Sequence, residues 1–468
     1  RSSDLCMKMK NQRRMLNKMR VKIKNTHMES LHCQLFSLIA GLVLFATSLV
    51  ANGQEMLTRQ DALNLTLKYN YNIKVAEKDL EVANNNQSIL NSGYLPSIVA
   101  NGNLGVSGYQ GENKTANGDF SYDPTEAYYY SGSVNLNYML FDGFGRMYNY
   151  KQLKELYNIS ELQARQIIDN TVLELSNAYF LMAQLTESVS SLKNALSIST
   201  NRMQRAAYSF EYGQTTQIDL LNAQVDVNND SINLLNTTQE LENARRNLNL
   251  IMGREIETEF VVDTTVSFSM PGTKDELVSQ AYQRNVLIEQ TNSQLRNSEF
   301  ALKASQSGWF PEVSLNAGYN YAGNRNPAGA FVTGSYNYGP QAGFTLSWNI
   351  FDGGATRVRN KNARIEIERQ QVLKEQTEYS VKRDVLNAYS AYQNALFVFN
   401  AEKANLETAL KNFERSDDLY KQGQINSIEF RQAQLNLRNA QNNFSIAKYN
   451  AKYEELKLKQ LSGILLED

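Results

Sequence analysis

The chain has 468 residues and an almost balanced charge, with 47 lysine and arginine residues against 48 aspartate and glutamate residues. No stripe of basic residues runs along it, so the composition argues against a nucleic-acid partner. It contains only six prolines. Because proline is poorly tolerated inside a helix, this scarcity leaves room for very long helices.

The amino-terminal segment has the pattern of a secretion signal. A basic stretch that begins at Arg13 precedes an apolar run over 35–50, and small residues around Ala51 supply a cleavage site. Residues 1–53 are therefore predicted to be a signal peptide, with the residues ahead of Met28 as candidate non-native upstream sequence. A transmembrane anchor is the alternative, but the apolar run is short for one.

Removal of this segment would also remove every cysteine and histidine of the chain, which are Cys6, Cys33, His27 and His32. A mature chain that begins near Gln54 offers no thiol or imidazole for nucleophilic, general-base or zinc chemistry. We therefore predict that the protein has no cofactor, no metal site and no enzymatic activity.

The strongest feature of the sequence is an internal duplication. The segment Ser92-Gly-Tyr-Leu-Pro96 returns 215 positions later as Ser307-Gly-Trp-Phe-Pro311, and Leu140-Phe-Asp-Gly143 returns 210 positions later as Ile350-Phe-Asp-Gly353. Matched segments in one order predict two copies of one structural unit. The copies are expected over 55–253 and 274–463, joined by a linker over 254–273.

Each copy is predicted to begin with a helical stretch, over 59–90 in the first and 274–305 in the second. A pair of strands follows, over about 95–141 and about 310–350. Gly-, Asn- and Tyr-rich segments over 110–126 and 323–337 are predicted to be the loops between paired strands.

Apolar and polar residues alternate along the predicted strands. In the last of them, polar or small residues separate Ala342, Phe344, Leu346, Trp348 and Ile350. Such alternation is typical of a half-buried soluble sheet, and also of membrane-barrel strands between lipid and a watery lumen. The secretion signal and the strand length favour the barrel. Four strands cannot close a barrel, because the smallest membrane barrels need about eight. The chain must therefore form an oligomer, with eight strands in a dimer or twelve in a trimer.

A very long helix is predicted after each strand pair. From Phe144 to Phe210 the chain has no proline, and a rise of about 1.5 Å per residue gives a helix of roughly 100 Å. Gly213 and Gly423 are predicted to end the long helices and lead into returning ones. Apolar residues with heptad spacing predict coiled-coil packing along three seams, over 175–196, 218–235 and 385–406.

The duplicated order of elements resembles that of the TolC-like outer-membrane efflux proteins. The turn motifs Tyr212-Gly-Gln-x-x-x-Ile-Asp-x-x-x-Ala-Gln224 and Gln422-Gly-Gln-x-x-x-Ile-Glu-x-x-x-Ala-Gln434 carry the resemblance, which extends over the whole mature chain. It implies a mixed α and β membrane protein of duplicated helix–strand–strand–long helix–helix units. In the implied trimer, a 12-stranded outer-membrane β-barrel is continued by a periplasmic α-helical barrel.

The resemblance also implies a function. The trimer would be a passive channel of the bacterial outer membrane that exports small molecules as the outer component of a tripartite efflux pump. The implied partners are a periplasmic adaptor protein, an inner-membrane pump and outer-membrane lipid. The chain itself would carry out no chemistry.

Positions of the periplasmic gate follow from the same resemblance. Glu429 falls on an acidic site of the family's constriction, whereas Gln432 falls on a second acidic site that this chain lacks. Asp219 and Tyr420 fall on a pair that links neighbouring hairpins, and Ile425 replaces an arginine link. Solvated surface acids are the alternative interpretation of Asp219 and Glu429. Hairpin tips for adaptor docking are expected at Gly213, Gln214, Gly423 and Gln424.

Two other functions remain compatible with the sequence. One is an outer-membrane duct of a protein-secretion system, because the sequence does not identify the cargo. The other is a secreted structural coiled-coil protein with soluble sheets. Charged residues at the apolar strand positions would favour the latter, and none occurs at the alternating positions named above.

Overall fold

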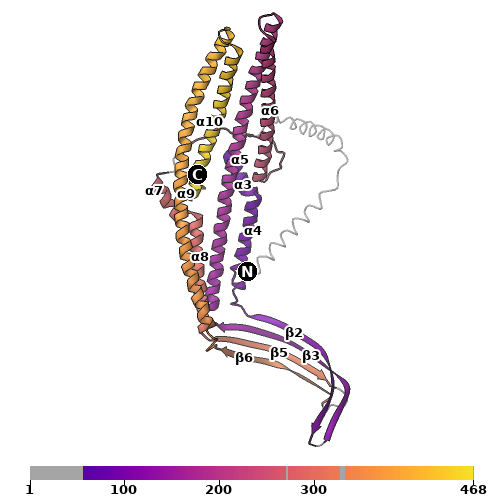
Figure 1. Cartoon of the computed structure of the whole chain (residues 1–468). Helices are drawn as coiled ribbons and strands as arrows, with labels where there is room; N and C mark the ends of the chain where they lie inside the picture. The colour runs from indigo at the N-terminus through magenta and orange to yellow at the C-terminus, as the bar shows by residue number, and fades with distance from the viewer. Residues whose placement is uncertain (1–55, 117, 270–271, 327–331, 467–468) are drawn as a thin grey trace, which may run out of the picture. The chain divides into compact units, whose positions relative to one another are not determined.

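The computed structural model describes residues 56–466 apart from 117, 270–271 and 327–331 (Figure 1). The signal peptide predicted over 1–53 lies outside the described residues.

Each half of the described chain runs through the same order of elements, ending with a 67-residue helix and a returning helix. In the first half these are α3 (Arg59–Tyr69), α4 (Tyr71–Asn86), η1 (Ile89–Asn91), β2 (Ser97–Thr115), β3 (Gly118–Phe141), α5 (Gly145–Glu211) and α6 (Gln217–Met252). In the second half they are α7 (Lys274–Arg284), α8 (Val286–Ser305), η2 (Gln306–Trp309), β5 (Glu312–Arg325), β6 (Gly334–Ser347), α9 (Ala355–Lys421) and α10 (Ser427–Leu461). The predicted duplicated unit is confirmed.

The first helical stretch of each half is divided in two, where the sequence predicted one continuous helix. Buried asparagines, Asn70 and Asn285, occupy the breaks and cap the helices that follow. The side-chain amide of Asn70 donates to the carbonyl of Ile251 at 2.7 Å, and that of Asn285 donates to the carbonyl of Leu461 at 2.8 Å. Each break therefore ties the first helices of a half to the end of its returning helix.

The segment predicted as a linker contains a short strand, β4 (Val261–Val262), which pairs in parallel with β1 (Met56–Leu57). The side chain of Tyr179, on α5, contacts the backbone at this strand pair. Its hydroxyl donates to the carbonyl of Leu57 at 2.9 Å and accepts the backbone N–H of Asp263 at 3.0 Å. Burial raises the pKa of Tyr179 to about 12, so the hydroxyl keeps its proton and this hydrogen bond at neutral pH.

One antiparallel sheet contains the four long strands in the order β2-β3-β5-β6. Its register aligns apolar residues into rows across the strands, such as Ala100, Val134, Tyr319 and Pro340, or Ile98, Leu136, Ala317 and Ala342. The row next to Ala100 and Val134, formed by Asn101, Ser133, Asn320 and Gly339, belongs to the opposite face because side chains alternate along a strand. One face is thus apolar and the other polar, and apolar side chains such as Val134 and Phe344 are 52% and 74% exposed.

The strands are longer than predicted where they pair at the hairpin ends, whereas β6 ends at Ser347, before the predicted strand positions Trp348 and Ile350. Pairing of β2 with β3 continues as far as Thr115 and Gly118, through the segment that was predicted to be a loop over 110–126. Pairing of β5 with β6 likewise reaches Arg325 and Gly334. Tyrosine and threonine favour strands, and here they outweigh the Gly and Asn content on which the loop predictions rested.

Two of the three predicted helical seams are buried. Leu175 and Met182 of α5, and Val385 and Tyr392 of α9, are at most 3% exposed. The seam of α6 is exposed instead, because this helix packs on α5 through Ala223 and other positions. Its exposed apolar residues are Ile218, Leu221, Val225, Ile232 and Leu235. Among the described residues, no helix is long and apolar enough to cross a bilayer.

Candidate functional site

The helices α5 and α6 form one long hairpin, and α9 and α10 form another (Figure 1). Each hairpin turns at a glycine. Gly213 and Gly423 have φ angles of +70° and +73°, in the left-handed region that favours glycine. The next residues, Gln214 and Gln424, donate their backbone N–H groups to carbonyls five residues earlier at 2.7 and 2.9 Å. These bonds close the helix ends and leave exposed turns. We call 212–216 and 422–426 the hairpin tips.

Asp219 and Glu429 both belong to capping boxes that start the returning helices. Asp219 accepts hydrogen bonds from the hydroxyls of Thr215 and Thr216, which lower the pKa of its carboxyl. Glu429 accepts the backbone N–H of Asn426 at 3.0 Å and donates its own N–H to the side-chain oxygen of Asn426 at 2.9 Å. Both acids therefore have a structural role. The spacing Thr-x-x-Asp and Asn-x-x-Glu could have predicted it from the sequence.

Within the described chain, the structure does not bring Asp219 and Tyr420 together. Asp219 is held in its capping box on α6, whereas the ring of Tyr420 on α9 stacks on Phe430 with centroids 4.6 Å apart. Gln432 is exposed and donates to the side chain of Asn436 at 2.9 Å.

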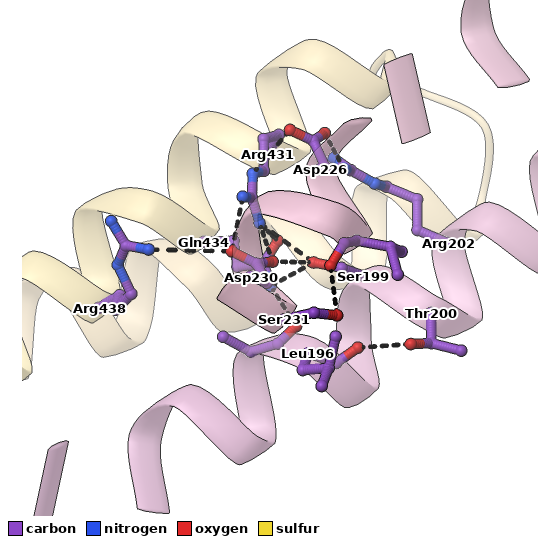
Figure 2. Close-up of polar contacts among 12 residues, drawn as sticks. Leu196, Ser199, Thr200, Arg202, Asp226, Asp230, Ser231, Arg431, Gln434 and Arg438 are labelled. Carbon is purple, nitrogen blue, oxygen red and sulfur yellow. Dashed lines mark hydrogen bonds and ion pairs between the residues drawn. The ribbon is translucent and has the colours of Figure 1, made fainter. Parts of the chain in front are cut away.

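A buried polar cluster lies behind the tips and joins the two hairpins (Figure 2). Both terminal nitrogens of Arg431 donate to the carboxylate of Asp230, at 2.7 and 2.9 Å. The hydroxyl of Ser199 donates to the same carboxylate. We call the following residues the inter-hairpin cluster: Ser199 and Arg202 of α5, Asp226 and Asp230 of α6, and Arg431 and Gln434 of α10.

Asp226 lies between the two arginines of this cluster. It forms an ion pair with Arg202 and lies 3.4 Å from the Nε atom of Arg431. Arg202 is 1% exposed and Asp230 is fully buried, so both charges depend on these partners.

The environment of the cluster favours the charged forms of its groups. Burial alone would raise the pKa of Asp230, but hydrogen bonds from Arg431 and Ser199 outweigh it and hold the pKa below its ordinary value. Burial would lower the pKa of Arg431, and its bonds to Asp230 raise it overall. The cluster is therefore a set of charge-assisted hydrogen bonds between hairpins, which are stronger than neutral ones.

This cluster was not predicted from the sequence. Its signal is the spacing of four between Asp226 and Asp230, which puts both carboxylates on one face of α6. Nothing in the sequence shows that Arg431, some 200 residues later, faces them. Among the described residues, no group of acidic, cysteine or histidine side chains is arranged to hold a metal ion.

Comparison with known proteins agrees with this architecture. Residues 62–254 and 277–464 match the family described as outer membrane efflux protein. The chain is 23% identical over 305 residues to outer membrane protein TolC of Vibrio cholerae serotype O1, an alignment that covers 63% of this chain and 68% of that protein. The TolC of Escherichia coli K12 is 21% identical over 305 residues, with 63% of this chain and 62% of that protein covered.

The fold is also found in solved structures. The Campylobacter jejuni CmeC outer membrane channel superposes with a TM-score of 0.69 at 16% identity, over 88% of this chain and 87% of that one. Since the family match spans most of both halves, the chain belongs to the outer membrane efflux protein family and is an efflux channel of the bacterial outer membrane.

Proposed function

We propose that this protein acts as a passive trimer that exports small molecules, as the outer component of a tripartite pump. The sheet is the observation that supports it. The four-stranded sheet has an apolar face, and in the described chain the outer edges of β2 and β6 have no partner strand. Open sheet edges are not tolerated in lipid, so this sheet needs further strands to cross a membrane. Three copies would supply the twelve strands of a closed barrel.

The exposed seam of α6 supports the same assembly. Ile218, Val225 and Leu235 are 66%, 56% and 71% exposed and repeat with heptad spacing. A stripe of this kind buries its apolar surface against another helix. In the proposed trimer that helix comes from a neighbouring copy, so the helices of three copies enclose a tunnel.

The proposed partner proteins dock at the hairpin tips. The exposed backbone of Gly213, Gln214, Gly423 and Gln424 would be the docking surface for a periplasmic adaptor protein, beyond which lies the inner-membrane pump. The chain would carry out no reaction, and the pump would supply the energy of transport.

Single-channel recording of the purified mature oligomer in a planar bilayer tests the channel. Discrete conductance steps from a particle with the mass of three chains are expected. A well-folded oligomer that never inserts would contradict the proposal. Export assays with small dyes and with an unfolded protein substrate would separate small-molecule efflux from a protein-secretion duct.

We further propose that the helix ends beside the hairpin tips form the constriction of the channel, lined by Asp219, Tyr420, Glu429 and Gln432. The carboxylate of Glu429 is exposed at the start of α10. Three copies would place three such charges around the axis, where multivalent cations bind and obstruct flow.

Replacement of Glu429 by glutamine is expected to weaken block by a trivalent cation, because it removes the charge but keeps an acceptor for the capping box. Gln432→Glu should strengthen the block by adding a second acidic ring. The measurement is the blocking concentration in single-channel recordings. If both variants block like the wild type, Glu429 does not line the constriction.

A further inference from the structure

A cavity of about 530 Å³ lies where the second half passes from sheet to helix. It is lined by η2 and the first turns of α9, which begins just beyond the end of β6 (Figure 1). Its walls include Trp309, Phe310, Arg357, Asn360, Lys361 and Arg364. Aromatic rings thus form one side of the cavity and cations the other.

The cations of this cavity have no acidic partner among the described residues. Arg357, Lys361 and Arg364 are exposed and follow one another with helical spacing on α9. Within the described chain, none of the three forms an ion pair. Two of the acids close by in the sequence are engaged elsewhere: Asp352 binds the backbone and hydroxyl of Thr356 and lies 3.7 Å from Arg359, and Glu366 binds Arg369 and Gln370. A third, Glu368, is exposed four residues beyond Arg364 and forms no ion pair with it among the described residues.

The first half carries matching cations in a different setting. Lys151 and Lys154 stand 210 positions before Lys361 and Arg364. In the first half they lie over aromatic rings of the chain itself, with the ammonium of Lys154 4.6 Å from the ring of Tyr150. Lys151 and Lys154 thus lie against aromatic rings in the first half, whereas Lys361 and Arg364 line an open cavity in the second half.

A change of residue between the halves contributes to the open space. The ring of Tyr150 fills the first-half position and packs edge-on against Tyr94, with centroids 6.1 Å apart. Asn360 stands in its place 210 positions later, and Trp309 corresponds to Tyr94. The smaller asparagine leaves room beside Trp309 for a ligand.

The apolar face of the sheet lies beside the cavity. The indole N–H of Trp348 donates to the carbonyl of Trp309 at 3.3 Å. Trp348 continues the alternation of exposed Phe344 and Leu346, and it is itself 57% exposed. In an outer-membrane channel this face meets lipid, and tryptophan is enriched where the hydrocarbon ends. The three cations of α9 then lie at the depth of the lipid headgroups, at the end of the sheet where the helices begin.

From this geometry we infer that the cavity binds the headgroup of an anionic phospholipid in the periplasmic leaflet. The phosphate meets Arg357, Lys361 and Arg364, and the acyl chains run along the apolar face past Trp348. Basic side chains near a membrane surface each favour anionic lipid by about fivefold. The inference rests on the outer-membrane placement of the sheet and not on the cargo or the gate.

The two tryptophans of the chain provide a direct test, because Trp309 lines the cavity and Trp348 is hydrogen-bonded to Trp309. The full-length oligomer is reconstituted in phosphatidylcholine vesicles that contain increasing fractions of brominated phosphatidylglycerol, or of brominated phosphatidylcholine. We expect brominated phosphatidylglycerol to quench tryptophan fluorescence at a fraction at least about fivefold lower.

The variant Arg357→Gln/Lys361→Gln/Arg364→Gln should lose this preference and respond equally to both lipids. A matched variant, Lys403→Gln/Lys411→Gln/Arg415→Gln, removes three exposed cations from the distant part of α9 and should behave as the wild type. Size-exclusion chromatography and conductance steps show for each variant that the channel still assembles.

Four results would overturn the inference. Equal quenching by both lipids in the wild type would remove the headgroup preference, and a preference that survives in the cavity variant would place it elsewhere. Weak quenching by either lipid would show that a neighbouring copy covers the cavity. In lipid-free detergent, inorganic phosphate should leave the fluorescence unchanged, and a response would indicate a site for free anions.

Discussion

Replacement of Val134 by lysine is expected to prevent stable insertion of the channel. Val134 lies in an apolar row near the middle of the paired strands and is 52% exposed in the single chain. A lysine on the lipid-facing side of a barrel strand costs about 2–4 kcal/mol at the bilayer midplane. Every copy of an oligomer carries the change, so each copy should lose this amount of stability in the membrane. Urea titration of the protein in vesicles measures it.

Ser133→Lys is the matched control. Ser133 neighbours Val134 in the same strand, but its side chain points to the polar face with Asn101 and Asn320. The same charge there should insert almost as well as the wild type and should alter ion selectivity. If the two lysine variants are equally unstable, the faces of the sheet have been assigned to the wrong environments.

Replacement of Asp230 by leucine is expected to destabilise the helical part of the protein by about 3–5 kcal/mol, the usual cost of leaving a buried charge without its partner. Arg431 would lose both of its bonds to the carboxylate. Loosening α6 from α10 should also raise the resting conductance, if the tips form the gate. The free energy of unfolding and single-channel recordings give the two readouts.

Asp230→Leu/Arg431→Met should recover much of that stability, because a packed apolar pair often replaces a buried ion pair at little cost. The exposed Lys78–Glu81 pair supplies a control, since Glu81→Gln should change the stability very little. An Asp230→Leu variant as stable as the wild type would show that the inter-hairpin cluster contributes nothing.

The pH dependence of stability should report the same group. The pKa of Asp230 is lower in the folded protein than its ordinary value, so its contribution is present above the pKa of the unfolded chain, which is about 3.9. It is lost as the pH falls through the lower, folded pKa. The wild type should therefore lose stability below about pH 4 in a step that Asp230→Leu lacks.

Much of the fold could be predicted because its signals are periodic and duplicated. The scarcity of proline and the heptads of α5 predicted a helix from Phe144 to Phe210, and α5 extends over Gly145–Glu211. The alternation in the strands predicted their faces. Glycine at Gly213 and Gly423 predicted both turns, since few other residues adopt a left-handed conformation without strain.

The remaining features depend on contacts that no local pattern encodes. The breaks at Asn70 and Asn285 are stabilised by carbonyls more than 170 residues away. The hydrogen bonds between Arg431 and Asp230 can form only when the two hairpins pack together. The seam of α6 was correctly read as apolar and heptad-spaced, but periodicity does not say whether the partner helix belongs to the same chain.

The equal lengths of α5 and α9 restrict how such a protein can change during evolution. Both have 67 residues, so the two hairpins of a subunit extend equally far from the sheet. Inserting seven residues into one of them would push its tip forward by about 10 Å, and inserting one would rotate everything beyond it by about 100°. Length variation in these helices is therefore expected to occur in whole heptads, and in both halves of the gene together.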